Sequence, residues 1–184
     1  MRLKLWLPLA VAGSMSLGSA ASSNTGRYQG VPFSQRGTVS QRVSYTNIDI
    51  EYNRPVARGR ELFGALVKWD SIWHPGADSA SRIKFDKDIV LQDKALAKGE
   101  YSFWLIPRQS APWTLILSKA AHVFHQPYPG EQHDALRVDI TPEKGAHMET
   151  MAFYFPVVGR DSVILRMHWG ETVLPIRIKV SREP

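Results

Sequence analysis

The chain has 184 residues, of which 43% are hydrophobic and 22% are charged, as is ordinary for one globular domain. It contains no cysteine, which excludes disulfides, thiol nucleophiles and cysteine-based zinc or iron–sulfur sites. The net charge of +6 comes from scattered residues with no long basic run, so the sequence does not predict a nucleic-acid partner.

Residues 1–20 have the features of a secretory signal peptide. Arg2 and Lys4 give a positive start, residues 5–12 form an apolar run, and residues 18–20 are small, as cleavage requires. The run is too short for an ordinary transmembrane helix, and an uncleaved anchor is the alternative. The sequence therefore predicts an exported protein, periplasmic or extracellular, with no membrane span after cleavage.

Residues 21–41 are rich in Ser, Gly, Gln and Thr and poor in large aliphatic side chains. This composition predicts a flexible N-terminal arm. The remainder, residues 42–184, is expected to form a single domain.

In that domain, apolar and polar residues alternate repeatedly at short spacing, which is typical of β-strands with one buried face. Such segments are residues 48–52, 82–85, 89–91, 101–105, 113–117, 136–140, 151–155, 163–167 and 174–180. The segment 101–105 is apolar on both faces and is expected to be a central strand. Gly170 and Glu171 favour a hairpin turn before the last strand, and Pro175 favours either an edge position or a late start for that strand.

The sequence shows no long amphipathic helix and no internal repeat. Together with the closely spaced strand signals, this predicts an all-β fold. Its expected architecture is an antiparallel β-sandwich or a partly closed barrel of about nine strands.

One stretch, Tyr52 to Ala77, has no strong periodicity and interrupts the strands. It concentrates arginines and tryptophans, namely Arg54, Arg58, Arg60, Trp69 and Trp73. Long irregular connections in compact domains are usually functional or disordered, and the apolar content here disfavours disorder. This stretch is therefore the first place to look for a site.

Several motifs in and after this stretch resemble an exported bacterial family known as a domain of unknown function, number 2911. They are Tyr52-x-Arg54-Pro55, Gly59-Arg60, Phe63-Gly64, Leu66-Val67, Trp73-x-x-Gly76-Ala77, Gly99-x-Tyr101-x-x-x-x-Ile106-Pro107, Trp113-x-x-Ile116, Glu149 and Trp169. The resemblance covers most of the chain after about Gln41. The resemblance implies an exported domain, and no reaction is known for the family that could be expected of this chain.

The chain departs from the family pattern directly after Trp73. The family usually continues Trp-Arg-Thr-Gly-Ala-Asn-Glu-Ala-Thr, whereas this chain has Trp-His-Pro-Gly-Ala-Asp-Ser-Ala-Ser at residues 73–81. The arginine, asparagine and glutamate of the pattern are absent. A function that depends on them would be changed or lost in this chain.

The arginines of the stretch allow two interpretations. Guanidinium groups suit carboxylates and phosphates, which predicts an anion clamp. Alternatively they hold the long connection in place, through carboxylates or by lying on tryptophan rings, and this interpretation is favoured.

The tryptophans fall into two groups according to their position in the alternation of apolar and polar residues along the predicted strands. Trp113 and Trp169 lie in phase with aliphatic neighbours and are expected in the core. Trp104 lies out of phase with Phe103 and is expected to form part of the opposite wall of a concavity. The predicted ligand-binding residues are Arg54, Arg60, Trp69, Trp73, His74, Asp78 and Trp104.

A second irregular connection contains His122, His125 and His133. This group of histidines is the part of the sequence that most resembles a metal site. The prolines at 127 and 129 disfavour a helix there, and no His-Glu-x-x-His pattern occurs. No Gly-x-Ser-x-Gly elbow occurs either. The sequence therefore predicts no metal, no other cofactor and no catalytic residues.

Three functional hypotheses remain open. The first is an exported, non-catalytic β-domain that binds a small ligand or glycan beside the Tyr52–Ala77 stretch. The second is a periplasmic hydrolase that uses His74 with Asp78, or His122 with His125. The third is a structural or protein-interaction module of the cell envelope.

Overall fold

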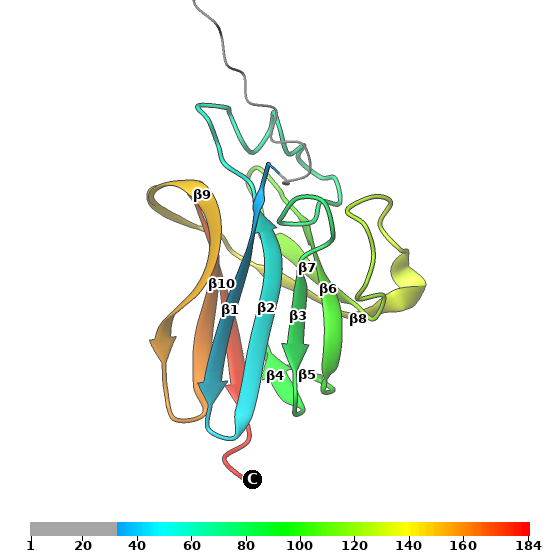
Figure 1. Cartoon of the computed structure of the whole chain (residues 1–184), viewed down its shortest axis with the longest axis vertical. Coiled ribbons are helices and arrows are strands. Elements are labelled where there is room, and N and C mark those ends of the chain that lie inside the picture. The colour runs from blue at the N-terminus through cyan, green and yellow to red at the C-terminus, as the bar shows by residue number, and fades with distance from the viewer. Residues whose placement is uncertain (1–32) are drawn as a thin grey trace, which may run out of the picture. The chain divides into compact units, whose positions relative to one another are not determined.

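In the computed structural model, which describes residues 33–184, ten β-strands form two antiparallel sheets (Figure 1). One sheet has six strands in the order β1-β2-β3-β6-β7-β8, and the other has four in the order β5-β4-β10-β9. The strands are β1 Gln35–Val43, β2 Thr46–Arg54, β3 Arg82–Phe85, β4 Ile89–Leu91, β5 Lys94–Leu96, β6 Gly99–Ile106, β7 Trp113–Ser118, β8 Asp134–Ile140, β9 Glu143–Val158 and β10 Ser162–Val180. A short 3-10 turn, Glu131–His133, precedes β8. The predicted all-β sandwich is confirmed.

The core follows from the period-two alternation of the strands. In β2, Ile48, Ile50 and Tyr52 are buried, whereas Asp49 between them is exposed. Successive strand residues point to opposite faces, so each strand gives every second side chain to the core. Burial of this apolar surface is the main favourable contribution to folding.

Strand β6 is central, as its sequence predicts, and pairs with β3 on one side and β7 on the other. Its outward-facing residue Trp104 forms a second small cluster with Ile116 and Ala80. Val123 and Tyr128 pack against that cluster. The outer face of β6 and β7 is therefore covered by chain rather than by solvent.

The N-terminal boundary of the domain lies earlier than predicted. Residues 35–41, which the sequence assigns to a flexible arm, belong to β1 and pair with β2 along its whole length. The strand resembles a linker in composition because most of its side chains are polar, and five of its nine residues are exposed. The predicted signal peptide, residues 1–20, and the rest of the arm lie outside the described residues, apart from 33 and 34.

The predicted hairpin at Gly170 and Glu171 is wrong, because β10 runs through these residues without turning. Gly170 adopts a φ of 58° where the register against β9 shifts, so the local feature is a bulge. A Cβ at this position would also lie 2.8 Å from Leu62. Glycine satisfies both requirements.

The edge position predicted from Pro175 is also wrong, since β10 lies between β4 and β9. Its pairing with β9 extends to Val173, and its pairing with β4 begins at Ile178. Pro175 falls between the two ladders, where its missing N–H interrupts neither.

Two long connections complete the domain. The first connection, residues 55–81, joins β2 to β3, and the second connection, residues 119–133, joins β7 to β8. Figure 1 shows the first connection at the end of the strands opposite the β1–β2 turn. The two connections touch through an antiparallel bridge between Ser79 and Phe124.

Candidate functional site

A cavity of about 420 Å³, open to solvent, lies beside the first connection. Its lining comes from Phe33 and Ser34, from the first connection, from His125 and Gln126 of the second connection, and from Trp169 of β10. The volume is in the range of pockets that hold small molecules. Of the predicted ligand-binding residues, those that line it are Arg60, Trp73, His74 and Asp78.

The floor of the cavity is aromatic. The rings of Trp73 and Trp169 stack with centroids 6.0 Å apart and planes 14° apart. Trp73 is fixed by its backbone, whose N–H donates to the Leu105 carbonyl at 2.8 Å and whose carbonyl accepts from the Leu105 N–H at 2.7 Å. Phe63 packs edge-on against both tryptophans. The floor is therefore continuous with the hydrophobic core.

Arg60 supports the connection on which it lies. Its Nε donates to the Ala57 carbonyl at 2.9 Å and its Nη2 to the Val56 carbonyl at 2.6 Å. These two bonds close the turn that contains Arg58 and Gly59, both of which have positive φ angles of 55° and 66°. The arginine thus has the supporting role that the sequence favours, while it also lines the cavity.

Arg58 is held at the mouth of the cavity by β9. Its backbone N–H donates to Glu149 Oε1 at 2.6 Å, and the backbone N–H of Ala57 donates to the Glu149 carbonyl at 2.7 Å. The pKa of Glu149 is lowered, first by its hydrogen bond with His147 and then by the Arg58 backbone. The Arg58 guanidinium lies over the Phe33 ring, 3.1 Å from its centroid.

His74 lies at the junction of the two connections and is only 4% exposed. Its ring stacks on that of His125, with centroids 5.9 Å apart. The pKa of His74 is lowered to about 4, first by burial and then by the charge of His125, while a backbone hydrogen bond with Ser79 opposes the shift. His74 is therefore a neutral imidazole at neutral pH.

The second connection presents His125 to this junction through two hydrogen bonds. The Asp78 carbonyl accepts from both the backbone N–H and the Nδ1–H of His125, each at 2.9 Å. The backbone N–H of Ala80 adds a bond to the Val123 carbonyl at 3.0 Å. The pairing of the connections thus assembles one end of the cavity.

Two polar atoms of cavity residues lack a partner. Among the described residues, five buried side-chain polar atoms have no hydrogen-bond partner, and they include His74 Nε2 and Trp169 Nε1. Buried polar atoms are almost always satisfied in folded proteins, so each exception calls for a physical explanation. One of these atoms is an indole donor, and the other belongs to a neutral imidazole.

Three predicted site residues lie elsewhere. Arg54 donates from Nε to the Met151 carbonyl at 3.0 Å and does not line the cavity. Trp69 packs on Phe63 and Trp113. Trp104 is 1% exposed, and its indole N–H donates to Ser102 Oγ at 2.8 Å. Trp104 therefore belongs to the small outer cluster and forms no opposite wall.

Sequence reasoning missed Arg58, Phe33, His125 and Trp169 as lining residues. Trp169 shows an ordinary core phase, and Phe33 precedes the first strand signal. His125 comes from a different connection, and no sequence pattern links it to His74. Among these residues, only Arg58 could have been predicted from the sequence, because it lies beside Gly59 in a turn.

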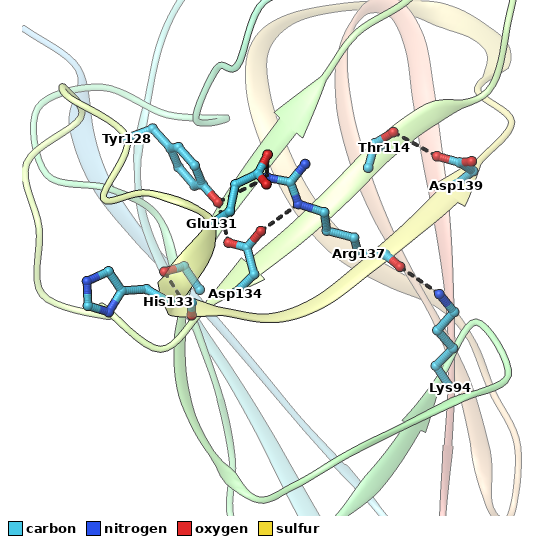
Figure 2. A network of polar contacts seen from close by, with 9 residues as sticks. Lys94, Thr114, Tyr128, Glu131, His133, Asp134, Arg137 and Asp139 are labelled. Carbon is cyan, nitrogen blue, oxygen red and sulfur yellow. Dashed lines mark hydrogen bonds and ion pairs between the residues drawn. The ribbon is translucent and has the colours of Figure 1, made fainter.

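The histidine side chains of the second connection do not form a cluster. His122 contacts Arg82 and Glu100 on the outer face of the six-stranded sheet, whereas His125 faces His74. Within residues 33–184, no group of three or more His, Asp or Glu side chains is placed to hold a metal ion. The second connection is instead fixed at its far end by Tyr128 (Figure 2).

That fixation is a small polar network. Tyr128 donates its hydroxyl to Asp134 Oδ1, and Arg137 donates from Nε to Asp134 Oδ2 at 2.5 Å. Arg137 also pairs with Glu131 at 3.1 Å. The pKa of Tyr128 is raised to about 12, first by burial and then by the bond to Asp134, while Arg137 opposes the shift. Figure 2 shows these side chains converging beside the start of β8.

Comparison with known proteins identifies a family. A family model described as a protein of unknown function (DUF2911) matches residues 34–178. Neither the curated proteins nor the solved structures contain a match. In the part of the chain that the structure describes, no helix is long and apolar enough to cross a membrane.

Proposed function

This chain belongs to the DUF2911 family, and we propose that it is an exported, non-catalytic domain that binds a small molecule or a short glycan in the cavity beside the first connection. Support for export comes from residues 1–20, whose charge, apolar run and small residues suit a signal peptide. Support for binding comes from the cavity itself.

The observation that carries this proposal is the pair of unsatisfied atoms, His74 Nε2 and Trp169 Nε1, on residues of one cavity. A neutral imidazole offers an acceptor and an indole offers a donor. A hydroxyl group both donates and accepts, so a hydroxyl-bearing ligand suits the pair. Trp73, backed by the buried Trp169 ring, adds a flat apolar surface against which a ligand ring can pack.

A hydrolase has weaker support. The Asp78 carbonyl, and not its carboxylate, contacts His125. Ser81 near His74 donates its hydroxyl to the Pro75 carbonyl at 2.6 Å, which leaves it without an activating base. A structural module would not need a cavity with unsatisfied polar atoms.

The test is a screen of small molecules and short glycans by nuclear magnetic resonance of the indole N–H groups. A ligand in the cavity should shift the Trp73 and Trp169 signals and leave Trp113 unmoved, because the Trp113 indole N–H donates to the Arg108 carbonyl away from the cavity. Ala77→Leu should abolish the shifts by filling the cavity. Ala95→Leu, on the exposed face of β5, is the matched control.

The proposal fails if no compound in the screen moves the two cavity signals. It also fails if Ala77→Leu leaves binding intact while the protein stays folded, since binding would then lie elsewhere.

A further inference from the structure

The rim of the same cavity gathers exposed apolar side chains and guanidinium groups. The described residues include seven exposed large hydrophobic side chains, and three of them, Phe33, Leu66 and Ile72, line this cavity. Exposed apolar groups concentrated in one place mark binding sites more often than scattered ones do.

A fourth exposed side chain, Phe124, lies beside the cavity. It is 58% exposed, and its ring packs against His125 with centroids 4.4 Å apart. Phe124 and Ile72 come from different connections, so neither connection alone creates the apolar rim.

The charges at the rim favour an anion. Arg58 and Arg60 are the basic lining residues, and Asp78 is the acidic one. Arg60 already donates two of its hydrogen bonds to backbone carbonyls. Within residues 33–184, the Arg58 guanidinium has a ring contact with Phe33 and a longer-range Coulombic interaction with Glu149, but no hydrogen bond or ion pair within 4.0 Å.

The orientation of Arg58 is suited to bidentate binding. Stacking on Phe33 occupies one flat face of the guanidinium and leaves its in-plane N–H groups available. Those groups match the two oxygens of a carboxylate or the oxygens of a phosphate or sulfonate. The positive φ of Arg58 is held in place by Glu149, so the turn is preorganised before any ligand arrives.

We infer that the ligand is an organic anion with an apolar body, whose acidic group pairs with Arg58 while its body covers Trp73, Ile72 and Leu66. This inference rests on the proposed function and narrows it from small molecules in general to one chemical class. Carboxylates, phosphates and sulfonates share the required chemistry.

Two fluorescent probes with the same ring system test this directly in the full chain. 1-Anilinonaphthalene-8-sulfonate carries an anionic group, and N-phenyl-1-naphthylamine is the same body without it. The anionic probe should bind at least about tenfold more tightly, because a charge-assisted hydrogen bond contributes that much. Arg58→Gln should remove this advantage and leave the affinity for the neutral probe unchanged.

Arg42→Gln is the matched control. Arg42 is an exposed arginine of β1 that does not line the cavity and donates to the Ser44 carbonyl, so its loss should change neither affinity. Arg58 is exposed, and its replacement by glutamine leaves the backbone bond to Glu149 in place. Circular dichroism of the variant should therefore match that of the unmodified protein.

Equal affinity for the two probes overturns the anion inference, and so does an Arg58→Gln variant that retains the preference. In either case the indole signals of Trp73 and Trp169 still decide the proposed function independently. Failure of the unmodified protein to bind the anionic probe also overturns the inference.

Discussion

The first connection lies on an apolar floor, whereas the second is held by polar contacts together with packing on the small outer cluster around Trp104. In the first, Ala57, Leu62 and Val67 are buried and Trp73 stacks on the core residue Trp169. In the second, Ala121 is the one buried hydrophobic residue among residues 119–133, and Tyr128 anchors it through a carboxylate. The comparison separates a segment stabilised mainly by area buried in the main core from one stabilised by hydrogen bonds, charge and a smaller apolar cluster.

This difference has a consequence for the site. The first connection fixes the cavity floor rigidly, because its aromatic side chains are interlocked with the sheets. The second connection contributes His125 through backbone pairing at Asp78 and Ala80. Conditions that weaken hydrogen bonds and ion pairs should therefore destabilise the wall that contains His125 before they destabilise the floor that contains Trp73.

The largest expected effect is on the apolar side. Trp73→Ala should lower the free energy of unfolding by about 3–5 kcal/mol, as truncation of a packed aromatic side chain does. Urea unfolding measures this loss. The partner variant on the second connection is Phe124→Ala, which should change stability by no more than about 0.5 kcal/mol because Phe124 is exposed. Equal effects of the two substitutions would contradict the comparison.

The next effect concerns the junction of the connections, at His74. Burial holds the folded-state pKa at about 4, below the ordinary 6.5, so folding favours the neutral ring. The stabilisation from the neutral ring is present above pH 6.5 and is lost as pH falls from 6.5 through 4. A shift of this size corresponds to a loss on the order of 3 kcal/mol.

Urea unfolding of the unmodified protein and of His74→Gln across pH 4–7 isolates this contribution, since the other titrating groups are common to both. The variant should lose less stability on acidification. Identical pH dependence of the two proteins would show that His74 does not hold the junction.

The polar anchor of the second connection should have a smaller effect. Tyr128→Phe removes the hydroxyl bonds with Asp134 and Arg137, and should lower the free energy of unfolding by about 1–2 kcal/mol. Tyr45→Phe, at an exposed tyrosine in the β1–β2 turn, is the control and should have no measurable effect.

The loss caused by Tyr128→Phe should also depend on pH. The folded-state pKa of Tyr128 is raised to about 12, from an ordinary value of 10.0. Folding thus favours the protonated phenol, whose stabilisation is full below pH 10 and declines as pH rises toward 12. The difference between the two proteins in urea unfolding should narrow over that interval, and a constant difference would argue against the network.

Most of the fold could be predicted because period-two alternation is local. Strand β2 shows this alternation clearly, whereas in β1 the alternation is hard to recognise because polar side chains occur on both faces. The continuity of β10 through Gly170 depends on a register shift against β9, and no property of the two-residue segment itself separates a bulge from a hairpin.

The site was predictable only where neighbouring residues share one connection. Trp73 and His74 are adjacent residues of the first connection, and both line the cavity. The direction of Trp69 is set by packing on Phe63 and Trp113, and the approach of His125 to His74 is set by the bridge between Ser79 and Phe124. These pairings join segments far apart in the chain, which a local pattern does not encode.

The smallest effect is expected at His122, which shares the second connection with His125 but faces the other way. His122 is largely exposed, and its partners Arg82 and Glu100 also contact each other, with Arg82 bonded to Glu51 as well. Removing the imidazole leaves those ion pairs intact, and exposed ion pairs contribute little. His122→Ala should therefore change the free energy of unfolding by no more than about 0.5 kcal/mol in urea.

His125→Ala, three residues away, removes the ring that stacks on His74 and should lower the free energy of unfolding by more. An equal or larger loss for His122→Ala would place the important polar contacts of the second connection on the outer face of the sheet, away from the cavity.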